Sequence, residues 1–532
     1  MEAITALTGT AILGSQRGSR SSSAFRAFNP ATGQAIAPDF YSSTHEEVDR
    51  AVHLATQAFS VYAWLSGRDK ARFLRHIADS LQAATDALVA RAHEETALPK
   101  PRLIGETART ANQLRLFADL IEEGSWLMAR IDTADPARTP LPKPDIRSML
   151  RPLGPVAVFG ASNFPLAFSV AGGDTASALA AGNPVIVKAH PAHPGTSELV
   201  GRIIAESVRA CGLPEGVFSL LFDSGIAVGK ALVQHPLVKA VGFTGSLQAG
   251  RALMDLAAAR PEPIPCFTEM SSVNPVFILP GAFAQQGQQI ATGVAASFTL
   301  GAGQFCTKPG LVFLPGENAA FTTELQQRVI ETPSFTMLTS GIASHYAEAL
   351  RQREAGGHAQ RSATATSVPD TASFAATAKL DEVELSSFLD NSELQEEVFG
   401  PAALLIRCTE PASFLSAAEA LRGSLTATIF GTEADLLEHQ ALVRILERKA
   451  GRLLFNGFPT GVEVCHAMVH GGPYPATADG RSTSVGTQAI FRFSRPVCYQ
   501  QFPDAALPEE LRSANPAGIL RLVNGSYTRE PV

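Results

Sequence analysis

The sequence lacks any uninterrupted apolar run long enough to cross a membrane as a helix, which takes about 18 residues. Its most apolar stretch, residues 170–187, is interrupted by Asp174 and by the pair Asn183-Pro184. The N-terminal segment "MEAITALTGTAILGSQRGSR" also lacks the positively charged start and compact apolar core of a secretory signal. We therefore expect no membrane association and a cytoplasmic location.

Cysteine is scarce, and its spacing excludes two common uses of it. The six cysteines lie far apart and form no C-x-x-C pair, so the sequence predicts neither a zinc site nor a disulfide framework. His190 and His193 have the i,i+3 spacing of metal ligands on a helix, but prolines flank them and disfavour a helix there. We expect no metal, a reducing compartment and free thiols.

Positive charge is also sparse. Lys and Arg number 43 against 50 Asp and Glu, the formal net charge is -7, and no block of the chain is strongly basic. These features disfavour a nucleic-acid surface. The chain has no fixed-period repeat, which disfavours solenoids and propellers. The chain has 532 residues, and a single hydrophobic core is usually built from fewer. We therefore expect two or three globular domains.

The chain changes its pattern after residue 150. Residues 45–93 and 102–123 carry apolar side chains at three- and four-residue spacing, which predicts amphipathic helices. From 154 to 246, short β-branched runs alternate with helical segments that end at glycine. Such alternation predicts an α/β fold with a doubly wound parallel sheet. A second α/β stretch follows residue 306.

Three further segments have distinctive compositions. The proline-rich residues 137–150 are predicted to connect to an extended segment. Residues 352–378 are rich in Ala, Ser, Thr and Gly, which is typical of a surface loop. Residues 488–500 alternate weakly and are predicted to form an edge strand, whose partner could be a neighbouring subunit.

Polar residues gather where predicted strands end, which is where open α/β sheets bind ligands. Asn163 follows one strand and precedes Phe164-Pro165. Its amide could stabilise an oxyanion or could cap the next helix. Lys188 closes another strand and could reach ribose hydroxyls or a phosphate, or could extend into solvent.

Two more strand ends carry candidates with open interpretations. Gly245 and Gly250 could begin a helix whose N-terminus faces a pyrophosphate, although a tight turn needs the same glycines. Glu269 is the only acid between Glu262 and Glu317. A carboxylate isolated among apolar residues suits a general base, and a structural ion pair explains it equally well.

The decapeptide "GAGQFCTKPG" surrounds Cys306 with Gly301, Gly303 and Gly310. Its first two glycines begin the G-x-G-x-x-G pattern of a dinucleotide loop, but the sixth position is the cysteine. By itself the segment leaves three interpretations open: a modified phosphate loop, a small buried hydrophobe, and a reactive thiol with room for a ligand.

Seven short motifs, in the family's order, resemble the aldehyde dehydrogenase superfamily from residue 28 to about residue 500. They are "NFP" at 163–165, "PVIVKA" at 184–189, "GFTGS" at 242–246, "TEMSS" at 268–272, "GQFCTKPG" at 303–310, "EEVFGP" at 396–401 and "NGFPTGVEV" at 456–464. Longer stretches such as "EMSSVNPVF" and "MVHGGPYPAT" are most similar to the 2-oxoglutarate semialdehyde (2,5-dioxopentanoate) dehydrogenase branch, which is related to NADP-dependent fatty aldehyde dehydrogenases.

This resemblance implies a Rossmann-like parallel-sheet cofactor domain, an α/β catalytic domain and a small β oligomerisation arm. A homodimer or homotetramer is then expected. The implied boundaries are 1–136 and 153–280 for the cofactor-binding domain with its N-terminal helices, 281–487 for the catalytic domain that carries Cys306, 137–152 and 488–510 for the arm, and 511–532 for a C-terminal tail.

The resemblance also implies roles by position. Cys306 resembles the nucleophile that attacks the aldehyde, and Glu269 resembles the base that activates water. Asn163 and the Cys306 backbone N–H correspond to the donors that hold the oxyanion. We expect Lys188 to contribute to catalysis as well as to cofactor binding. His470 resembles a histidine near the active site of the related fatty aldehyde dehydrogenases, and we expect it among the residues that contact the substrate. The expected cofactor contacts are Lys188, Gly245, Ser246, Gly250, Glu397 and Phe399.

Two positions bear on the choice between NAD and NADP. Pro191 stands where many NAD-preferring relatives have a glutamate, so a 2′-phosphate would meet no carboxylate. Gly225-Ile226 stands where close relatives tend to have an Asn-Arg pair, and the missing arginine weakens the case for NADP. We expect both cofactors to work, with NADP slightly favoured.

The expected reaction is the oxidation of 2,5-dioxopentanoate to 2-oxoglutarate through a thiohemiacetal and a thioester on Cys306. Arg109 lies on a helix that the family packs beside the substrate tunnel and could hold the distal carboxylate, or it could be an exposed helix arginine. A medium- or long-chain fatty aldehyde would instead need an apolar tunnel, which Phe164, Phe168 and Phe305 could line.

Two other classes of function are disfavoured. A non-catalytic scaffold with the same fold should have lost Cys306, Glu269 or Asn163, and the chain retains all three. An enzyme that passes the thioester to coenzyme A has no need of a base such as Glu269, which serves hydrolysis.

Overall fold

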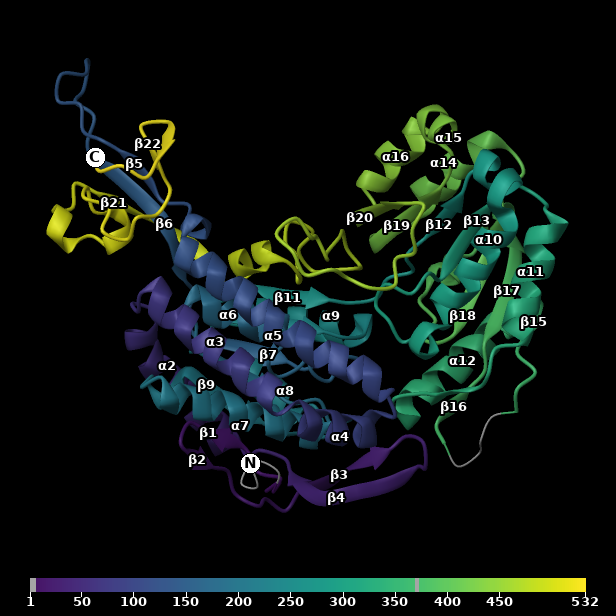
Figure 1. Ribbon diagram of the computed structural model, residues 1–532, viewed down its shortest axis with the longest axis horizontal. Helices are drawn as coiled ribbons and strands as arrows, with labels where there is room; N and C mark the ends of the chain where they lie inside the picture. Colours follow the sequence, from purple (N-terminus) through teal and green to yellow (C-terminus); the bar gives the residue numbers. More distant parts are fainter. Residues whose placement is uncertain (1–5, 369–372) are drawn as a thin grey trace.

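The structure is a computed structural model that describes residues 6–368 and 373–532. Figure 1 shows two large sheets, each with its own helices, and a small sheet that projects away from the first. The expected α/β architecture is confirmed. Among the described helices, none combines the length and the apolar character that a membrane span requires.

The first sheet has the strand order β11-β10-β7-β8-β9-β1-β2. Strands β11 to β9 are parallel, and β1 pairs antiparallel with β9 and β2 at one edge. Val158 of β7 packs into a core shared with α3 and α5, whereas its neighbour Phe159 packs into a core with α2 and α8. Both faces are therefore covered, as parallel sheets require. The strands are β1 (Ile12–Leu13), β2 (Gln16–Arg17), β7 (Val156–Phe159), β8 (Val185–Lys188), β9 (Phe218–Leu221), β10 (Ala240–Thr244) and β11 (Cys266–Glu269).

The helices predicted over 45–93 and 102–123 are confirmed as four helices, and the later helices also follow the predicted alternation. Thr44 begins the first of them with a capping box to Glu47. The helix after β8 begins at Pro194, where the buried Glu95 carboxylate accepts the N–H groups of Gly195 and Thr196 in its first turn. The helices are α2 (His45–Tyr62), α3 (Gly67–Ala83), α4 (Thr85–Thr96), α5 (Lys100–Glu123), α6 (Gly173–Ala181), α7 (Pro194–Ala210), α8 (Ala227–Gln234) and α9 (Leu247–Ala258).

The second sheet has the order β15-β17-β18-β13-β12-β19-β20. All its pairs are parallel except β15 with β17. The first of these strands along the chain is β12. The second unit therefore starts before residue 280, where the resemblance implied that the cofactor-binding domain ends. The strands are β12 (Val276–Ile278), β13 (Leu311–Leu314), β15 (Gln360–Thr364), β17 (Lys379–Glu384), β18 (Ala402–Arg407), β19 (Ser424–Phe430) and β20 (Ala450–Phe455). The helices are α10 (Pro280–Thr299), α11 (Ala319–Ile330), α12 (Ser340–Gly356), α13 (Leu385–Asp390), α14 (Pro411–Ala420), α15 (Glu433–Glu438) and α16 (Gln440–Glu447).

The prediction of a surface loop over 352–378 was wrong for much of that range. Helix α12 extends to Gly356, β15 joins the second sheet, and β16 (Ala375–Ala376) pairs with β14 (Phe335–Thr336). Ala363 of β15 is buried in the core of the second unit, so pairing with β17 outweighs the loop-like composition. Residues 369–372 lie outside the described residues.

The projecting sheet has the order β21-β6-β5-β22-β23. The edge strand predicted over 488–500 is confirmed in its second half, since β21 pairs with β6, while the preceding residues form the 3₁₀ helix η5. The region expected as a tail, 511–532, contributes two strands, because β22 pairs with β5. Both β5 and this region therefore belong to the same sheet as β6. The elements are β5 (Arg130–Asp132), β6 (Ile146–Pro152), η5 (Thr487–Phe493), β21 (Ser494–Gln500), β22 (Arg521–Val523) and β23 (Ser526–Thr528).

Candidate active site

Cys306 follows a turn that its neighbouring glycines make possible. After α10 the chain enters the 3₁₀ turn η3 (Leu300–Gly303), where residues 301–303 have positive φ values of 57, 61 and 65°. A Cβ on Gly303 would lie 2.1 Å from the carbonyl oxygen of Gly400, so only glycine allows these two backbone segments to approach. This packing explains the glycines without a bound phosphate.

The Cys306 sulfur meets two residues that are distant in sequence. His470 Nε2 lies 3.4 Å from Cys306 Sγ and 3.0 Å from Glu269 Oε1. Ser484 Oγ donates a 2.6 Å hydrogen bond to the other oxygen of Glu269. Glu269 ends β11 of the first sheet, whereas Cys306 belongs to the second unit. A sulfur, an imidazole and a carboxylate thus form one cluster between the two units.

The hydrogen bonds of His470 indicate which ring nitrogen carries the proton. Its ring is buried, and Nδ1 has no hydrogen-bond partner within the described residues. A proton on Nδ1 would leave a buried N–H unpaired, whereas an empty acceptor there is less costly. The favoured neutral tautomer therefore carries its proton on Nε2, pointing at Glu269 and Cys306.

The environment moves the pKa values of the two acids in opposite directions. Burial pushes the pKa of Glu269 up, but the adjacent His470 imidazole and the hydrogen bonds from His470 and Ser484 hold it below its usual range. Burial and the nearby charge of Glu269 raise the pKa of the Cys306 thiol well above its usual range. Glu269 is therefore a carboxylate at neutral pH, while Cys306 is a thiol that must pass its proton on before it can attack as a thiolate.

Asn163 lies against the Cys306 loop, as expected for an oxyanion donor. The side-chain NH₂ group of Asn163 donates a 3.0 Å hydrogen bond to the backbone carbonyl oxygen of Gln304. The backbone carbonyl of Asn163 accepts a 2.7 Å hydrogen bond from Arg102. One amide hydrogen remains for an oxyanion, because an NH₂ group has two donors. The role of Asn163 in holding an oxyanion stays a prediction.

Three residues near the cysteine were not identified from the sequence. Asn274 is fully buried and donates to the carbonyl oxygens of Cys306, at 2.8 Å, and Lys308, at 3.0 Å. Lys308 is also buried, and its ammonium donates 2.9 Å bonds to the carbonyls of Val398 and Ala402. Ser484 is the third. Asn274 stands in the quoted motif "EMSSVNPVF", but nothing in that motif indicates its partners.

Four of the predicted cofactor contacts, Lys188, Gly245, Ser246 and Gly250, belong to the first unit. Lys188 ends β8 and is buried, and burial lowers its pKa to about 8 while the charge of Asp223 opposes the shift. Within the described residues its ammonium makes no hydrogen bond. A buried cation with unused donors fits the hydroxyls or phosphates of a dinucleotide.

The turn after β10 has a structural explanation that does not depend on a cofactor. Ser246 is the N-cap of α9, and its hydroxyl accepts from Ala249 N at 3.2 Å. A Cβ on Gly245 would lie 2.5 Å from the Phe243 ring, and one on Gly250 would lie 2.6 Å from the Met270 side chain. The N-terminus of this helix is still free to face a phosphate, so these three contacts stay predictions.

Glu397 and Phe399 lie in the segment between the short 3₁₀ turn η4 (Ser392–Gln395) and β18. Burial raises the pKa of Glu397 to about 7, and the charge of Lys308 opposes the shift. Because Lys308 also binds the carbonyl next to Glu397, it ties the cysteine loop to the segment expected to grip a ribose.

The predicted substrate residues form one group beside the cluster. The Phe164 ring lies 5.2 Å from that of Phe168 and 5.4 Å from that of Phe305, and the Phe168 ring lies 6.2 Å from that of His470. Arg102 stacks on Phe164 and Phe305 at 4.9 and 4.8 Å, and Arg109 stacks on Phe168 at 5.1 Å. The aromatic wall is therefore capped by two guanidinium groups. Arg109 is not an exposed helix arginine, because it is largely covered.

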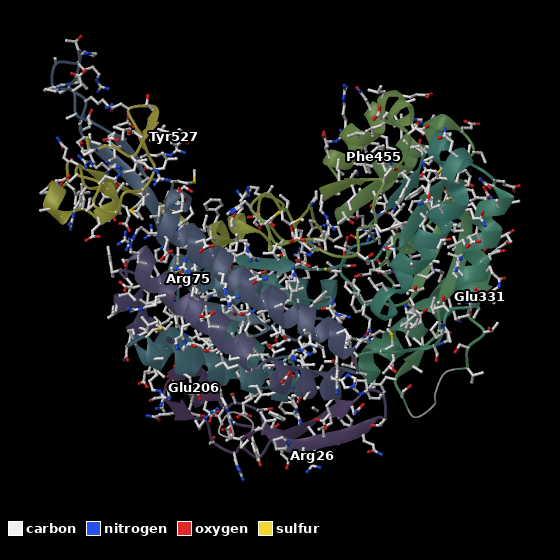
Figure 2. All side chains as sticks on the ribbon, viewed as in Figure 1. Arg26, Arg75, Glu206, Glu331, Phe455 and Tyr527 are labelled. Carbon is white, nitrogen blue, oxygen red and sulfur yellow. The ribbon has the colours of Figure 1, made fainter. Side chains whose placement is uncertain are left out.

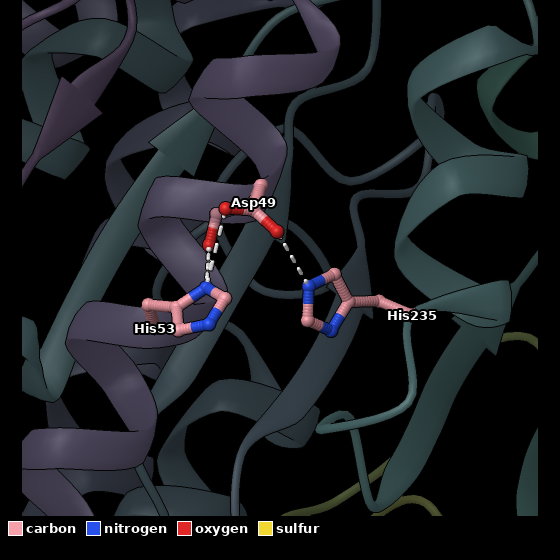
Figure 3. Close-up of side chains that lie close together, drawn as sticks. All are labelled: Asp49, His53 and His235. Carbon is pink, nitrogen blue, oxygen red and sulfur yellow. Dashed lines mark hydrogen bonds and ion pairs between the residues drawn. The ribbon is translucent and has the colours of Figure 1, made fainter.

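A second histidine cluster, on the surface of the first unit, has the composition of a metal site (Figure 3). His235 Nε2 and His53 Nδ1 each lie 3.3 Å from a carboxylate oxygen of Asp49. His235 Nδ1 accepts from Leu237 N, and His53 Nδ1 lies 2.9 Å from the Asp49 carbonyl. The nitrogens that face Asp49 therefore carry protons, so hydrogen bonds to Asp49 account for the cluster without a metal.

Comparison with known proteins gives a consistent result. A family model described as "Aldehyde dehydrogenase family" matches residues 17–482. The chain is 52% identical to "Alpha-ketoglutaric semialdehyde dehydrogenase 2" of Azospirillum brasilense, over 98% of this chain and 99% of that protein. It is 48% identical to "Alpha-ketoglutaric semialdehyde dehydrogenase" of Acinetobacter baylyi, over 92% and 93%. Its fold is similar to that of a Thermus 1-pyrroline-5-carboxylate dehydrogenase with bound NAD, with a TM-score of 0.77 and 20% identity over 93% of each chain.

Proposed function

The chain belongs to the aldehyde dehydrogenase family, and on this basis we propose that it oxidises 2,5-dioxopentanoate, the semialdehyde of 2-oxoglutarate, to 2-oxoglutarate with NADP or NAD. Cys306, His470 and Glu269 carry the proposal, because they bring a nucleophile, an imidazole donor and a carboxylate base together, with His470 Nε2 3.4 Å from the sulfur and 3.0 Å from the carboxylate. The names of the two relatives that are 52% and 48% identical support the same substrate for this chain.

The first half of the reaction uses Cys306 and Asn163. The Cys306 proton passes to the Glu269 carboxylate, which releases it to water before the second half, and the thiolate forms a C–S bond to the aldehyde carbon. The former carbonyl oxygen becomes an oxyanion that the remaining Asn163 donor and the Cys306 backbone N–H stabilise. A bound nicotinamide would supply the hydride acceptor for this carbon, and loss of the hydride would leave a thioester on Cys306.

The second half uses Glu269. Its carboxylate takes a proton from water, whose oxygen attacks the thioester carbon. The C–S bond then breaks, the carboxylic acid leaves and Cys306 regains its proton. Steady production of NAD(P)H without coenzyme A is expected, and a requirement for coenzyme A would contradict this half.

The cofactor is proposed to bind to Lys188, to Glu397 and to the N-terminus of α9. The unused donors of the buried Lys188 support this assignment. Pro191 and Gly225-Ile226 act in opposite directions on a 2′-phosphate, so both cofactors should work, with NADP slightly favoured. A kcat/KM ratio above about 100 for NAD over NADP, worth about 2.7 kcal/mol, would overturn that order.

The substrate assignment is tested with a panel of aldehydes assayed with NAD and NADP in parallel. The most informative comparison is between 2,5-dioxopentanoate and pentanal. Their carbon chains are equally long, but only 2,5-dioxopentanoate carries a carboxylate. The guanidinium caps on the aromatic wall favour the charged substrate over a fatty aldehyde. A higher kcat/KM for pentanal or hexanal than for 2,5-dioxopentanoate would refute the assignment.

Assembly and location complete the proposal. The projecting sheet ends in β21, whose outer edge has no partner within the described residues, and Tyr527 on the same sheet is 72% exposed (Figure 2). An open strand edge and an exposed aromatic support a homodimer or homotetramer built through this sheet. The six unpaired cysteines support a cytoplasmic location. Light scattering after gel filtration measures the assembly, and a monomer would contradict it.

A further inference from the structure

The segment that carries Asn163 contains no helix or strand. Residues 160–172 connect β7 to α6, so neither a helix nor a sheet ladder holds them in place. Within the segment, the N–H of Ala161 donates to the carbonyl of Phe168 at 2.9 Å, and the N–H of Phe168 donates to that of Phe164 at 3.3 Å. These bonds close the loop, but its position relative to Cys306 also depends on partners outside it.

Two side chains one turn apart on α5 hold this segment from outside. Arg102 Nη2 donates to the backbone carbonyl of Asn163 at 2.7 Å. Glu106 Oε1 accepts from the N–H groups of Leu166, at 2.9 Å, and Ala167, at 3.0 Å. Residues i and i+4 of a helix lie on the same face, so α5 holds the loop at Asn163 and again three and four residues later.

The Glu106 carboxyl group makes no other hydrogen bond within the described residues. The side chain is buried, and its second oxygen, Oε2, is unpaired. Burial raises the pKa of Glu106, and the charge of Arg102 and the two N–H bonds oppose the shift. Burying a carboxyl group costs free energy, and at this position its hydrogen bonds serve only to hold the loop.

Arg102 also contacts the turn that leads to Cys306. Its guanidinium stacks on the rings of Phe164 and Phe305, 4.9 and 4.8 Å from their centroids. A Cβ on Gly301 would lie 3.0 Å from Arg102 Nη1. Arg102 therefore touches both the loop that carries the amide donor and the turn that presents the sulfur.

We propose that Glu106 and Arg102 are positioning residues for the oxyanion donor. Together they hold the backbone around Asn163 so that its remaining amide hydrogen faces the oxyanion formed on the carbon bound to Cys306. This inference rests on the proposed function, in which Asn163 stabilises that oxyanion, and deepens it by assigning the groups that hold the donor. Such a donor is effective only when its geometry is fixed in advance, and a displacement of about 1 Å can lower a rate about 10²-fold.

The competing explanation is that Glu106 only stabilises the packing of α5 on the loop. Glu198 of α7 offers a matched control, because its fully buried carboxylate also accepts backbone N–H groups, from Thr8 at 3.0 Å and Gly9 at 2.9 Å. These two residues precede β1, near the edge of the first sheet opposite β11. Glu198 also pairs with Arg202, so its loss should cost at least as much stability.

The test is a double-mutant cycle on the rate of acylation, with 2,5-dioxopentanoate and cofactor at saturation. The rate is taken from the NAD(P)H burst or, once acylation limits turnover, from kcat. Asn163→Ala should lower it about 10²–10³-fold. We expect Glu106→Leu to lower it about 10–100-fold in the wild type but less than about 3-fold in the Asn163→Ala background, because the group that it positions is already gone.

Two further variants separate positioning from stability. Glu106→Gln keeps an oxygen that can accept the same two N–H bonds, so it should recover most of the lost rate. Glu198→Leu should leave the rate of the folded enzyme within about 3-fold of the wild type. A Glu198→Leu enzyme as slow as Glu106→Leu would show a general effect of lost stability and would overturn the inference.

The outcomes distinguish the inference from the function on which it rests. If 2,5-dioxopentanoate is not oxidised, the proposed substrate fails, and the same cycle with hexanal still decides the inference. If Asn163→Ala lowers acylation less than about 3-fold, the oxyanion role fails and the inference fails with it. If Asn163→Ala is slow but Glu106→Leu lowers acylation equally in both backgrounds, or in neither, only the positioning role fails.

Arg102→Met is decisive should Glu106→Leu not fold. Methionine keeps an apolar contact with the two phenylalanine rings and removes the donor to the Asn163 carbonyl. Acylation should fall about 10-fold in Arg102→Met alone and less than about 3-fold when Asn163→Ala is already present. An equal effect in both backgrounds, or none in either, overturns the inference.

Discussion

Replacing His470 with leucine should raise the pKa of Glu269. His470 Nε2 lies 3.0 Å from Glu269 Oε1 and 3.4 Å from Cys306 Sγ, and leucine is an apolar side chain without a donor. Glu269 would keep only the Ser484 bond, at 2.6 Å. The charged form of this buried carboxylate would then be less well stabilised, while the cost of its burial would remain.

The size of the shift follows from the bond that is lost. A hydrogen bond to a charged group contributes about 1.5–3 kcal/mol, and one pKa unit corresponds to 1.36 kcal/mol. The pKa of Glu269 should therefore rise by about 1–2 units. Ser484→Ala removes the other hydrogen bond to the same charged carboxylate, which falls in the same range of about 1.5–3 kcal/mol, and should raise the pKa of Glu269 by a similar amount.

The assay is pre-steady-state kinetics as a function of pH. The burst of NAD(P)H reports acylation of Cys306, and the steady rate reports hydrolysis of the thioester, which needs Glu269 as a carboxylate. The acid limb of the hydrolysis profile should move to higher pH in His470→Leu and in Ser484→Ala. A midpoint within about 0.3 units of the wild type in a folded, burst-competent His470→Leu would refute the coupling of His470 to Glu269.

Four further changes have defined outcomes. Cys306→Ser should lower dehydrogenase turnover at least about 10³-fold, and substantial remaining NAD(P)H production would disprove its role as nucleophile. Glu269→Gln should lower steady turnover about 10²–10⁴-fold. Because it removes a neighbouring negative charge, it should also lower the pKa of the Cys306 thiol, which is measured by the pH dependence of iodoacetamide alkylation. An unchanged alkylation profile would contradict that electrostatic coupling. Asn274→Asp should cost about 2–5 kcal/mol of unfolding free energy in urea titrations, because two buried carbonyls lose their donor, and a cost below about 0.5 kcal/mol would show that water replaces it. Lys308→Met should raise the cofactor KM roughly 10-fold by releasing the segment that carries Glu397, whereas the matched Lys449→Met, which also loses two Nζ–carbonyl bonds, should not.

The secondary structure could be predicted where it depends on local pattern. The apolar spacing in α2 to α5 and the β-branched runs of β7 to β10 were sufficient, because each element buries its own apolar face. The strands β15, β22 and β23 could not be predicted in the same way. They are short and lack a clear alternating apolar pattern. β15 and β22 form because β17 and β5, distant in sequence, offer them a pairing edge, and β23 then pairs with β22.

The candidate site divides along the same line. Cys306, Glu269 and Asn163 could be identified from the chain itself, since strand ends and the glycine-rich turn concentrate reactive side chains within a few residues. Their surroundings could not: His470 and Ser484 reach Glu269 across 201 and 215 residues, and Asn274 reaches the Cys306 carbonyl across 32. The sequence by itself therefore determined the family and indicated Cys306, Glu269 and Asn163 as the candidate reactive residues. Only the tertiary structure decided their pKa shifts, the position of His470 between acid and sulfur, and the stacking of Arg109 on Phe168, because these depend on distances between side chains that no local pattern encodes.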